Sequence, residues 1–233
     1  MMHGRETSLA LLRTQRSHIL FVLSNPKPDH EGKFREWYRS AYREQIASIT
    51  DVLCGRHYEK HPFDITKGQY MLLPFHYLAL YEVSVDGAEA AAPLIDRIMA
   101  LHHEQSAAQA PATWLYYPAT EKVGRSPPIL PSMLTVAFAN GVPGQEDAFR
   151  EWYATRHIRH ALNIPALVSG QTFERTQFQR PGALEAKFAT IAVYEQAGTP
   201  ESILESFAAL PPGALDFPML DLSHFAESVY RPL

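Results

Sequence analysis

The amino-acid sequence predicts an α+β fold built from two copies of one βαββαβ unit. The first observation is an internal repeat, because Leu20–Glu59 aligns without a gap with Thr135–Glu174 and 11 positions are identical. The second is the block Phe-Arg-Glu-Trp-Tyr, which occurs intact in both copies. The third is the same order of apolar runs and turns in each copy. The identical pairs are Asn25/Asn140, Pro28/Pro143, Glu31/Glu146, Phe34/Phe149, Arg35/Arg150, Glu36/Glu151, Trp37/Trp152, Tyr38/Tyr153, Ile49/Ile164, Gly55/Gly170 and Glu59/Glu174.

A proline-rich segment, residues 124–131, separates the two copies. Its prolines hold extended backbone and prevent either neighbouring element from continuing through it. We therefore expect an N-terminal extension at residues 1–17, a first repeat at 18–125 and a second repeat at 126–233. Later in each copy, Leu80-Tyr81-Glu82 matches Val193-Tyr194-Glu195, and Glu121-Lys122-Val123 matches Glu227-Ser228-Val229.

Each copy is expected to contain the same elements in the same order. A strand comes first and ends in a turn rich in Asn, Pro and Gly, which leads into a helix carrying Phe-Arg-Glu-Trp-Tyr. Two strands, a second helix and a closing strand follow. The expected first strands are His18–Ser24 and Met133–Ala139, the middle strands 51–61, 69–84, 166–177 and 185–196, and the second helices Gly87–Gln105 and Pro200–Leu210. This order gives a four-stranded antiparallel sheet with both helices on one face. Two such sheets can cover each other's free faces and close around a small-molecule pocket.

Composition limits the classes of partner. The net charge of −4, with no long run of either sign, favours neither nucleic acid nor an anionic membrane. The apolar runs are far too short to cross a bilayer, and no secretory signal is recognisable. The single cysteine, Cys54, cannot form an internal disulfide. We expect a cytoplasmic protein that binds a hydrophobic small molecule, and the sequence leaves open whether it forms a homodimer.

The helix of the second copy carries the candidate catalytic residues. At 100° per residue, one broad face holds Phe149 and Tyr153 together with Arg156, His157 and His160. Packing explains the aromatic residues of such a face, but it does not call for two imidazoles and a guanidinium. The first copy has Ala41, Tyr42 and Gln45 at these three positions, so the second copy is predicted to hold the functional site. A structural role, with a hydrogen-bonded histidine and solvated arginines, is the competing interpretation.

The stretch from Phe149 to Gly170 resembles the EthD-like group of the dimeric α/β-barrel (ferredoxin-like) superfamily. In that group a Trp-Tyr pair precedes a helix-borne histidine, then a proline-containing turn into the second strand. The usual proline two residues after the histidine is replaced here by Arg159, so the helix is expected to continue to Leu162. The resemblance implies a barrel of two ferredoxin-like repeats, made within one chain. Its relatives include isomerases, cyclases, dehydratases, decarboxylases, monooxygenases and haem-dependent enzymes, so it implies no single reaction.

The leading hypothesis is a lyase- or isomerase-type enzyme that needs no cofactor and acts on an aromatic or polyketide-like molecule. His157 would be the general acid/base, with His160 and Arg156 assisting. The residues expected to line the substrate site are Tyr153, Trp152, Tyr42, Trp37, Tyr38 and His76. A non-catalytic binding barrel is one alternative. A haem- or metal-dependent oxygenase is another, although no third ligand obviously joins His157 and His160 in a metal site.

Overall fold

The computed structural model describes residues 18–66, 68–125, 129–180, 184–211 and 217–233. The predicted extension at 1–17 therefore lies outside the described residues, as do residues 126–128 at the start of the predicted second repeat. The strands are β1 (His18–Ser24), β2 (Val52–Lys60), β3 (Tyr77–Val83), β4 (Ala112–Pro118), β5 (Val123–Gly124), β6 (Met133–Ala139), β7 (Leu167–Arg175), β8 (Thr190–Gln196) and β9 (Ala226–Pro232). The helices are α1 (Glu31–Arg39), α2 (Ala41–Ala47), α3 (Ala92–Glu104), α4 (Glu146–Trp152), α5 (Ile158–Ala161) and α6 (Pro200–Ala208). Shorter helical segments are 3-10 turns at Ala88–Ala91 and Leu222–His224 and a π-helical segment at Tyr153–His157.

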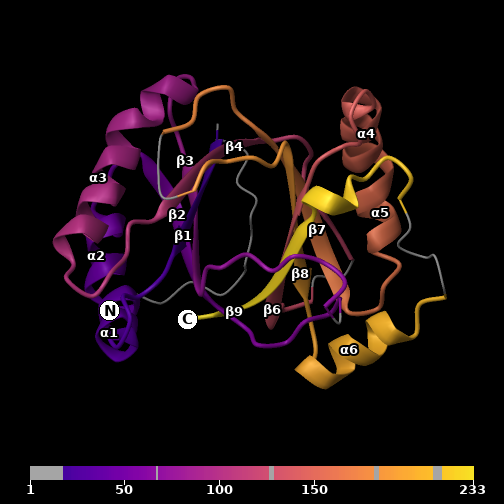
Figure 1. Ribbon diagram of the computed structural model, residues 1–233, viewed down its shortest axis with the longest axis horizontal. Coiled ribbons are helices and arrows are strands. Elements are labelled where there is room, and N and C mark those ends of the chain that lie inside the picture. The colour runs from indigo at the N-terminus through magenta and orange to yellow at the C-terminus, as the bar shows by residue number, and fades with distance from the viewer. Residues whose placement is uncertain (1–17, 67, 126–128, 181–183, 212–216) are drawn as a thin grey trace.

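Eight of these strands form a closed antiparallel barrel (Figure 1). Their order is β4-β1-β3-β2-β9-β6-β8-β7, and β7 pairs again with β4. The last strand of each half therefore joins the two halves, since β4 pairs with β7 and β9 pairs with β2. The predicted fold is confirmed: two ferredoxin-like βαββαβ repeats close into one intramolecular α/β-barrel.

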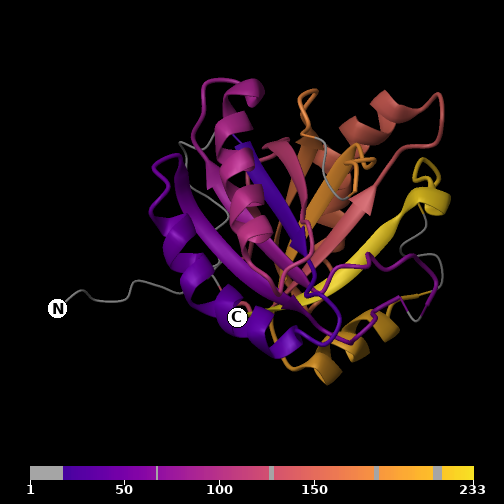
Figure 2. The same cartoon turned by 60° about the vertical axis from the view of Figure 1, so that its left-hand side comes forward.

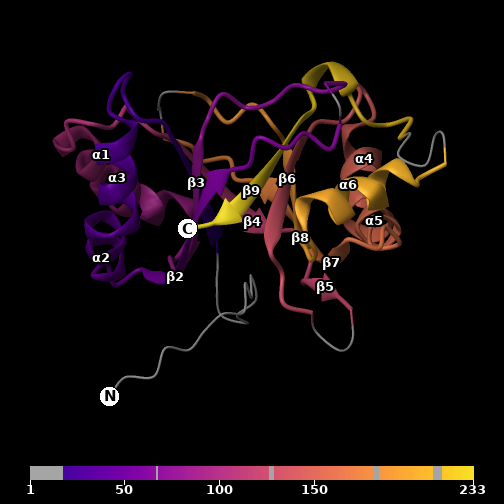
Figure 3. The same cartoon turned by 90° about the horizontal axis from the view of Figure 1, so that it is seen from below.

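The two faces of the sheet have different partners. Alternate side chains such as Phe21, Leu80, Val136 and Val193 point inward and fill the barrel with a closely packed apolar core. The other face of each half packs against helices, with α1, α2 and α3 on one side of the barrel and α4, α5 and α6 on the other (Figures 1 and 3). Because side chains fill the barrel interior, the pocket expected at its centre is replaced by a cavity on the helix side.

The strand expected at 69–84 is shorter than predicted. Only Tyr77–Val83 is a strand, and the residues described between 61 and 76 belong to a loop that crosses from β2 over β9 to the second half (Figures 1 and 2). The peptide N–H of Glu227 donates to the carbonyl of Met71, which holds this loop beside β9. The first half thus contributes a segment to the surface of the second half.

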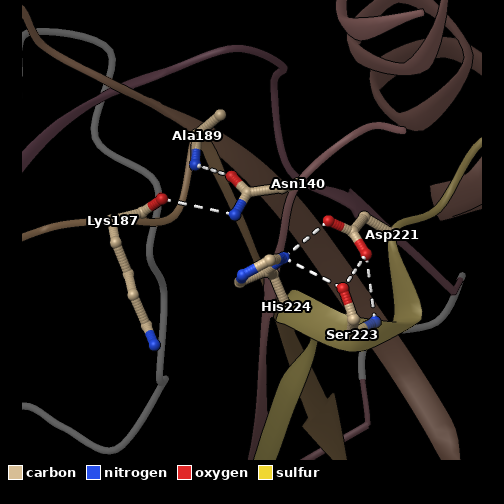
Figure 4. A network of polar contacts seen from close by, with 6 residues as sticks. All are labelled: Asn140, Lys187, Ala189, Asp221, Ser223 and His224. Carbon is tan, nitrogen blue, oxygen red and sulfur yellow. Dashed lines mark hydrogen bonds and ion pairs between the residues drawn. The ribbon is translucent and has the colours of Figure 1, made fainter. Parts of the chain in front are cut away.

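The repeated asparagine has the same structural role in both halves. Asn25 follows β1, donates to the carbonyl of Pro74 and accepts from the N–H of His76. Asn140 follows β6, donates to the carbonyl of Lys187 and accepts from the N–H of Ala189 (Figure 4). Each asparagine ties the end of the first strand to the residues just before the third strand, which explains its presence in both copies.

The helix of the second half contains an irregularity that the sequence did not predict. After α4, the segment Tyr153–His157 has the wider turn of a π-helix, and α5 begins only at Ile158. A π segment adds one residue to a turn, so every later side chain is displaced around the axis relative to a regular helix. Ile158 and Ala161 consequently face the core, and Arg156 and His160 are exposed. The predicted placement of Arg156 and His160 on the buried face is therefore wrong. The helix ends at Ala161, with Leu162 as its cap, close to the expected end.

Candidate functional site

A cavity of about 390 Å³ lies between the sheet and the helices of the second half. Its floor is formed by β6, β8 and β9, one wall by the π-helical segment and α5, and another by α6. The loop from β2 to β3 completes it, with Ile65, Thr66, Gln69 and Tyr70. Most of its lining is aliphatic or aromatic. The polar members from the second half are Thr135, Tyr153, His157, Tyr194 and Glu227.

His157 lies within a group of aromatic rings. Its imidazole stacks on Tyr153, with ring centroids 4.4 Å apart and an angle of 7° between the planes. Phe217 meets it edge-on at 4.6 Å, and Trp152 lies 5.2 Å away. Burial, with a smaller contribution from the repulsion of His160, lowers the pKa of His157 to about 3. The imidazole is therefore neutral near pH 7 and accepts a proton only weakly.

Glu227 is a carboxyl group that was not among the residues predicted from the sequence. It lies at the start of β9, opposite Ala137 of β6, and its side chain points to the helix face. It is half-buried, since one side faces the cavity and protein surrounds the rest. Burial, together with repulsion from Asp64, raises the pKa of Glu227 to about 8. Such a carboxyl changes protonation state near physiological pH, which is typical of functional sites.

Four buried polar atoms of the cavity residues have no hydrogen-bond partner among the described residues. They are Thr135 Oγ1, Tyr153 Oη, His157 Nδ1 and Tyr194 Oη. An unsatisfied buried polar atom costs about 1–3 kcal/mol. The first half has comparable atoms on its helix side, including Tyr38 Oη and Thr113 Oγ1, but these do not line the cavity. Protein encloses each of the four atoms, so a molecule in the cavity would reach them only after these side chains move.

The structure brings only some of the predicted residues together. His157 and Tyr153 line the cavity, and Trp152 packs behind them against Phe217. Arg156 and His160 are exposed outside the cavity lining. The remaining predicted residues belong to the first half: Tyr38 and Tyr42 are fully buried in its core, Trp37 packs against that core, and His76 is exposed beside a second, smaller cavity.

Strand pairing shows which residues correspond in the two halves. Val22 pairs with Thr113 and Ala137 pairs with Glu227, so Glu227 corresponds to Thr113. The match of short sequence blocks pairs Glu227 with Glu121 instead, which makes the glutamate look shared. By strand pairing, the first half has a threonine at this position, so only the second half has a glutamate there.

Four substitutions distinguish the helix-facing surface of the second half from that of the first. In the order first half to second half, they are Leu20/Thr135, Val22/Ala137, Tyr42/His157 and Thr113/Glu227. At each of these positions the second half has a smaller or more polar side chain than the first. Aromatic residues shared by both halves, such as Tyr81 and Tyr194, stay in place. The cavity is thus a local feature of one half, built on a framework common to both.

The equivalent region of the first half is filled. Tyr42 stacks on Tyr38 at 5.1 Å, and His57 occupies the adjacent space, with its Nε2 2.8 Å from the hydroxyl of Tyr81. His102 of α3 closes the region, and its Nε2 lies 3.0 Å from Oγ of Ser24. These internal contacts take the place that a ligand can occupy in the second half.

The histidines and carboxylates of the chain are dispersed. Among the residues that the structure describes, no three His, Cys, Asp or Glu side chains are grouped so that they could hold a metal ion. Within the same part of the chain, every helix is too short or too polar to span a lipid bilayer.

Comparison with known proteins defines the fold more clearly than the activity. No protein-family model matches the chain, and no curated protein is detectably similar in sequence. Among solved structures, an anthrone oxidase-like protein superposes with a TM-score of 0.55 at 11% identity, covering 94% of this chain and 92% of the other. A proposed monooxygenase from Fusobacterium nucleatum gives a TM-score of 0.58 at 11% identity, covering 94% and 93%. A mutant chlorite dismutase from Candidatus Nitrospira defluvii gives 0.55 at 10% identity, covering 96% and 94%.

These structures correct the leading functional hypothesis. They are described as an oxidase-like protein, a monooxygenase and a chlorite dismutase, and not as isomerases or lyases. The oxygenase-type alternative agrees with them better. Independently, the low pKa of His157 makes it a poor general base near pH 7, because its buried imidazole stays neutral.

Proposed function

We propose that this chain is an oxygenase-type enzyme that oxidises a hydrophobic aromatic small molecule with dioxygen in the cavity of its second half. The observation that carries the proposal is the cavity of the second half, in which aliphatic and aromatic side chains surround one carboxyl group, that of Glu227. The reaction class is taken from the structurally similar proteins. The chemistry within the cavity is derived from its own residues.

Glu227 is the proposed proton acceptor. Its carboxylate takes a proton from an acidic methylene group of the substrate, which leaves a resonance-stabilised carbanion. The carbanion adds to dioxygen through a new C–O bond, and the resulting peroxide takes up the proton from Glu227. The remaining C–H hydrogen then leaves as a proton while the O–O bond breaks, which releases water and leaves a carbonyl group. In sum, one methylene group and one dioxygen give one carbonyl and one water. A base with a pKa of about 8 is well matched to this task near neutral pH.

The tyrosines are proposed to stabilise the charge that develops on the substrate. Burial raises the pKa of Tyr153 and of Tyr194 above the ordinary value, so both hydroxyls keep their protons and remain hydrogen-bond donors. Donors held in fixed positions by the surrounding protein stabilise an enolate oxygen more strongly than water does. His157 contributes a neutral ring that can bind a second substrate oxygen through Nδ1.

The residues around His157 do not fit a haem group. A histidine that ligates a metal usually donates its second ring N–H to a carboxylate or carbonyl, which fixes the orientation of the ring. Nδ1 of His157 has no such partner among the described residues, and Tyr153 covers one face of the ring. The proposed reaction therefore includes no step through haem.

A direct assay tests the proposed function. Anthrone, a tricyclic ketone with an acidic methylene, serves as the substrate, and oxygen uptake and quinone absorbance are recorded. We expect Glu227→Gln to lower kcat by roughly 10²–10⁴-fold. Glu151→Gln, which changes an exposed carboxyl of α4, is the matched control and should retain full activity. Equal activity of Glu227→Gln and the control would exclude Glu227 as the base. Binding of anthrone without oxygen uptake would favour a carrier instead.

Further proposals concern the family, origin and location of the chain. Membership of the EthD-like group is supported by the motif around His157, and descent from a tandem duplication by the residues that the two halves share. A cytoplasmic location and a division at residues 125/126 are proposed as well. Light scattering of the purified chain would establish whether it forms a homodimer.

A further inference from the structure

A second cavity, of about 220 Å³, adjoins the first. It lies beneath the loop from β2 to β3 and is bordered by Lys60, His61, Asp64 and His76. Glu227 and Ile65 line both cavities, and of these two only Glu227 can ionise. The carboxyl of Glu227 therefore borders the catalytic cavity of the second half on one side and a cavity formed largely by the first half on the other.

Asp64 is held in this second cavity as a fixed negative charge. One carboxylate oxygen accepts from the N–H of Thr66 at 2.8 Å and from its hydroxyl at 2.6 Å. The other oxygen accepts from the N–H of Gly68 at 2.7 Å. These hydrogen bonds, which favour the ionised form, keep the pKa of Asp64 below its ordinary value despite partial burial. The same bonds shape the loop that carries Thr66, Gln69 and Tyr70 to the catalytic cavity.

Other ionisable groups border the same two cavities. On the catalytic side, Tyr153, His157 and Tyr194 are neutral near pH 7, because burial disfavours their charged forms. On the other side, Lys60 donates to the carbonyl of Leu73, 2.6 Å away, and its positive charge also helps to lower the pKa of Asp64. His61 Nδ1 accepts from the N–H of Phe63, and His76 lies at the exposed margin. Asp64 is thus the negative charge that Glu227 faces across the second cavity.

Building on the proposed function, we propose that Asp64 is a positioning residue that controls the protonation of Glu227 across the second cavity. The first half, whose own helix-side region is filled, would then set the pH at which the second half becomes active. A nearby like charge disfavours ionisation of a carboxyl, and the repulsion acts through a site that is partly shielded from water. This agrees with the contribution of Asp64 to the raised pKa of Glu227.

The test measures the titration of Glu227 directly. Protein labelled with carbon-13 at the glutamate side-chain carboxyl is titrated by NMR, and the Glu227 signal is assigned by its loss in Glu227→Gln. In Asp64→Asn, we expect the Glu227 midpoint to move to lower pH by about half a unit or more. Asp64→Glu keeps the charge while altering the loop hydrogen bonds, so its midpoint should stay close to that of the unchanged protein.

The possible outcomes distinguish an effect of the Asp64 charge from an effect of the loop that Asp64 shapes. If Asp64→Asn and Asp64→Glu move the midpoint equally, Asp64 acts only through the shape of the loop, and the proposal is wrong. An unchanged midpoint in Asp64→Asn also overturns it. Because the titration needs no substrate, its result does not depend on whether the chain oxidises anthrone. Where turnover is present, the acid limb of the pH–rate profile should shift in Asp64→Asn in the same direction as the NMR midpoint.

Discussion

At the scale of the residue, Thr135 makes the floor of the cavity more polar and lowers the stability of the second half. Its hydroxyl is buried and has no partner among the described residues, whereas the first half has Leu20 at the equivalent position. Replacing an unsatisfied hydroxyl by an apolar group removes a desolvation cost and fills space. Such residues are informative because packing alone would favour the leucine.

Thr135→Leu is therefore expected to raise the free energy of unfolding by about 1–2 kcal/mol, as measured by urea denaturation. It should also weaken the binding of anthrone by roughly tenfold, equivalent to about 1.4 kcal/mol, because the leucine occupies part of the cavity. Leu20→Thr is the reciprocal control and should destabilise the first half without changing ligand binding. Unchanged affinity in Thr135→Leu would show that the ligand does not reach this floor residue.

Buried histidines predict a loss of stability in mild acid. Burial lowers the pKa of His57 to about 3 and that of His102 to about 4, and His157 behaves similarly. The histidines of the unfolded chain therefore take up protons below about pH 6.5 while those of the folded chain do not, so the contribution of these histidines to stability is complete above that pH and is lost progressively towards pH 4. Glu227 acts in the opposite sense, since its raised pKa makes stability fall as the pH rises from about 4.5 through 8.

We expect the urea midpoint to fall between about pH 7 and about pH 5.5, with each histidine contributing on the order of 1 kcal/mol. His57→Gln should reduce this pH dependence, because glutamine does not titrate. The exposed His103→Gln serves as the control and should leave the slope unchanged. A slope that is the same in both variants would contradict the assignment to buried imidazoles.

At the scale of the element, a glycine in each second strand lets a tyrosine ring lie across the sheet. A Cβ atom at Gly170 would come within 2.9 Å of both the Tyr194 ring and Ile158, and one at Gly55 within 3.0 Å of the Tyr81 ring. Both distances are shorter than normal contacts. This explains why the glycine is one of the residues that the two copies share.

Gly170→Ala should destabilise the protein by about 1–3 kcal/mol, because Tyr194 and Ile158 must both move. At Gly32, in α1, a Cβ atom would have no neighbour within 4 Å among the described residues, so Gly32→Ala should stabilise by about 0.4–1 kcal/mol. Thermal unfolding of the two variants measures both effects. If the two variants behaved alike, the proposed crowding at Gly170 would be wrong.

Elements also show where sequence reasoning succeeded and where it failed. The first strands were predicted to the residue, since a mostly apolar run followed by turn residues is a strong local signal. Arg156 and His160 were misplaced because a regular period of 3.6 residues cannot represent the π segment, which depends on tertiary packing. Glu227 was missed because short matches at the chain end do not fix strand register, whereas backbone pairing does.

At the scale of the whole molecule, each half has an apolar sheet face that the other half covers. The two seams, β4 with β7 and β2 with β9, are equivalent. Expressed alone, residues 126–233 should therefore form a homodimer that rebuilds a barrel from two second halves, as measured by light scattering. The dimer should bind anthrone more weakly than the full chain, because it lacks the loop that carries Thr66 and Gln69. A monomeric, folded fragment would contradict this expectation.

Closure of the barrel within one chain also changes how its stability responds to dilution. In a barrel made by two separate chains, folding and association are coupled, so the unfolding midpoint depends on protein concentration. Here both seams are intramolecular, which makes the equilibrium unimolecular. The assembled site is then maintained at any expression level, and the two halves are free to diverge because neither must pair with a copy of itself.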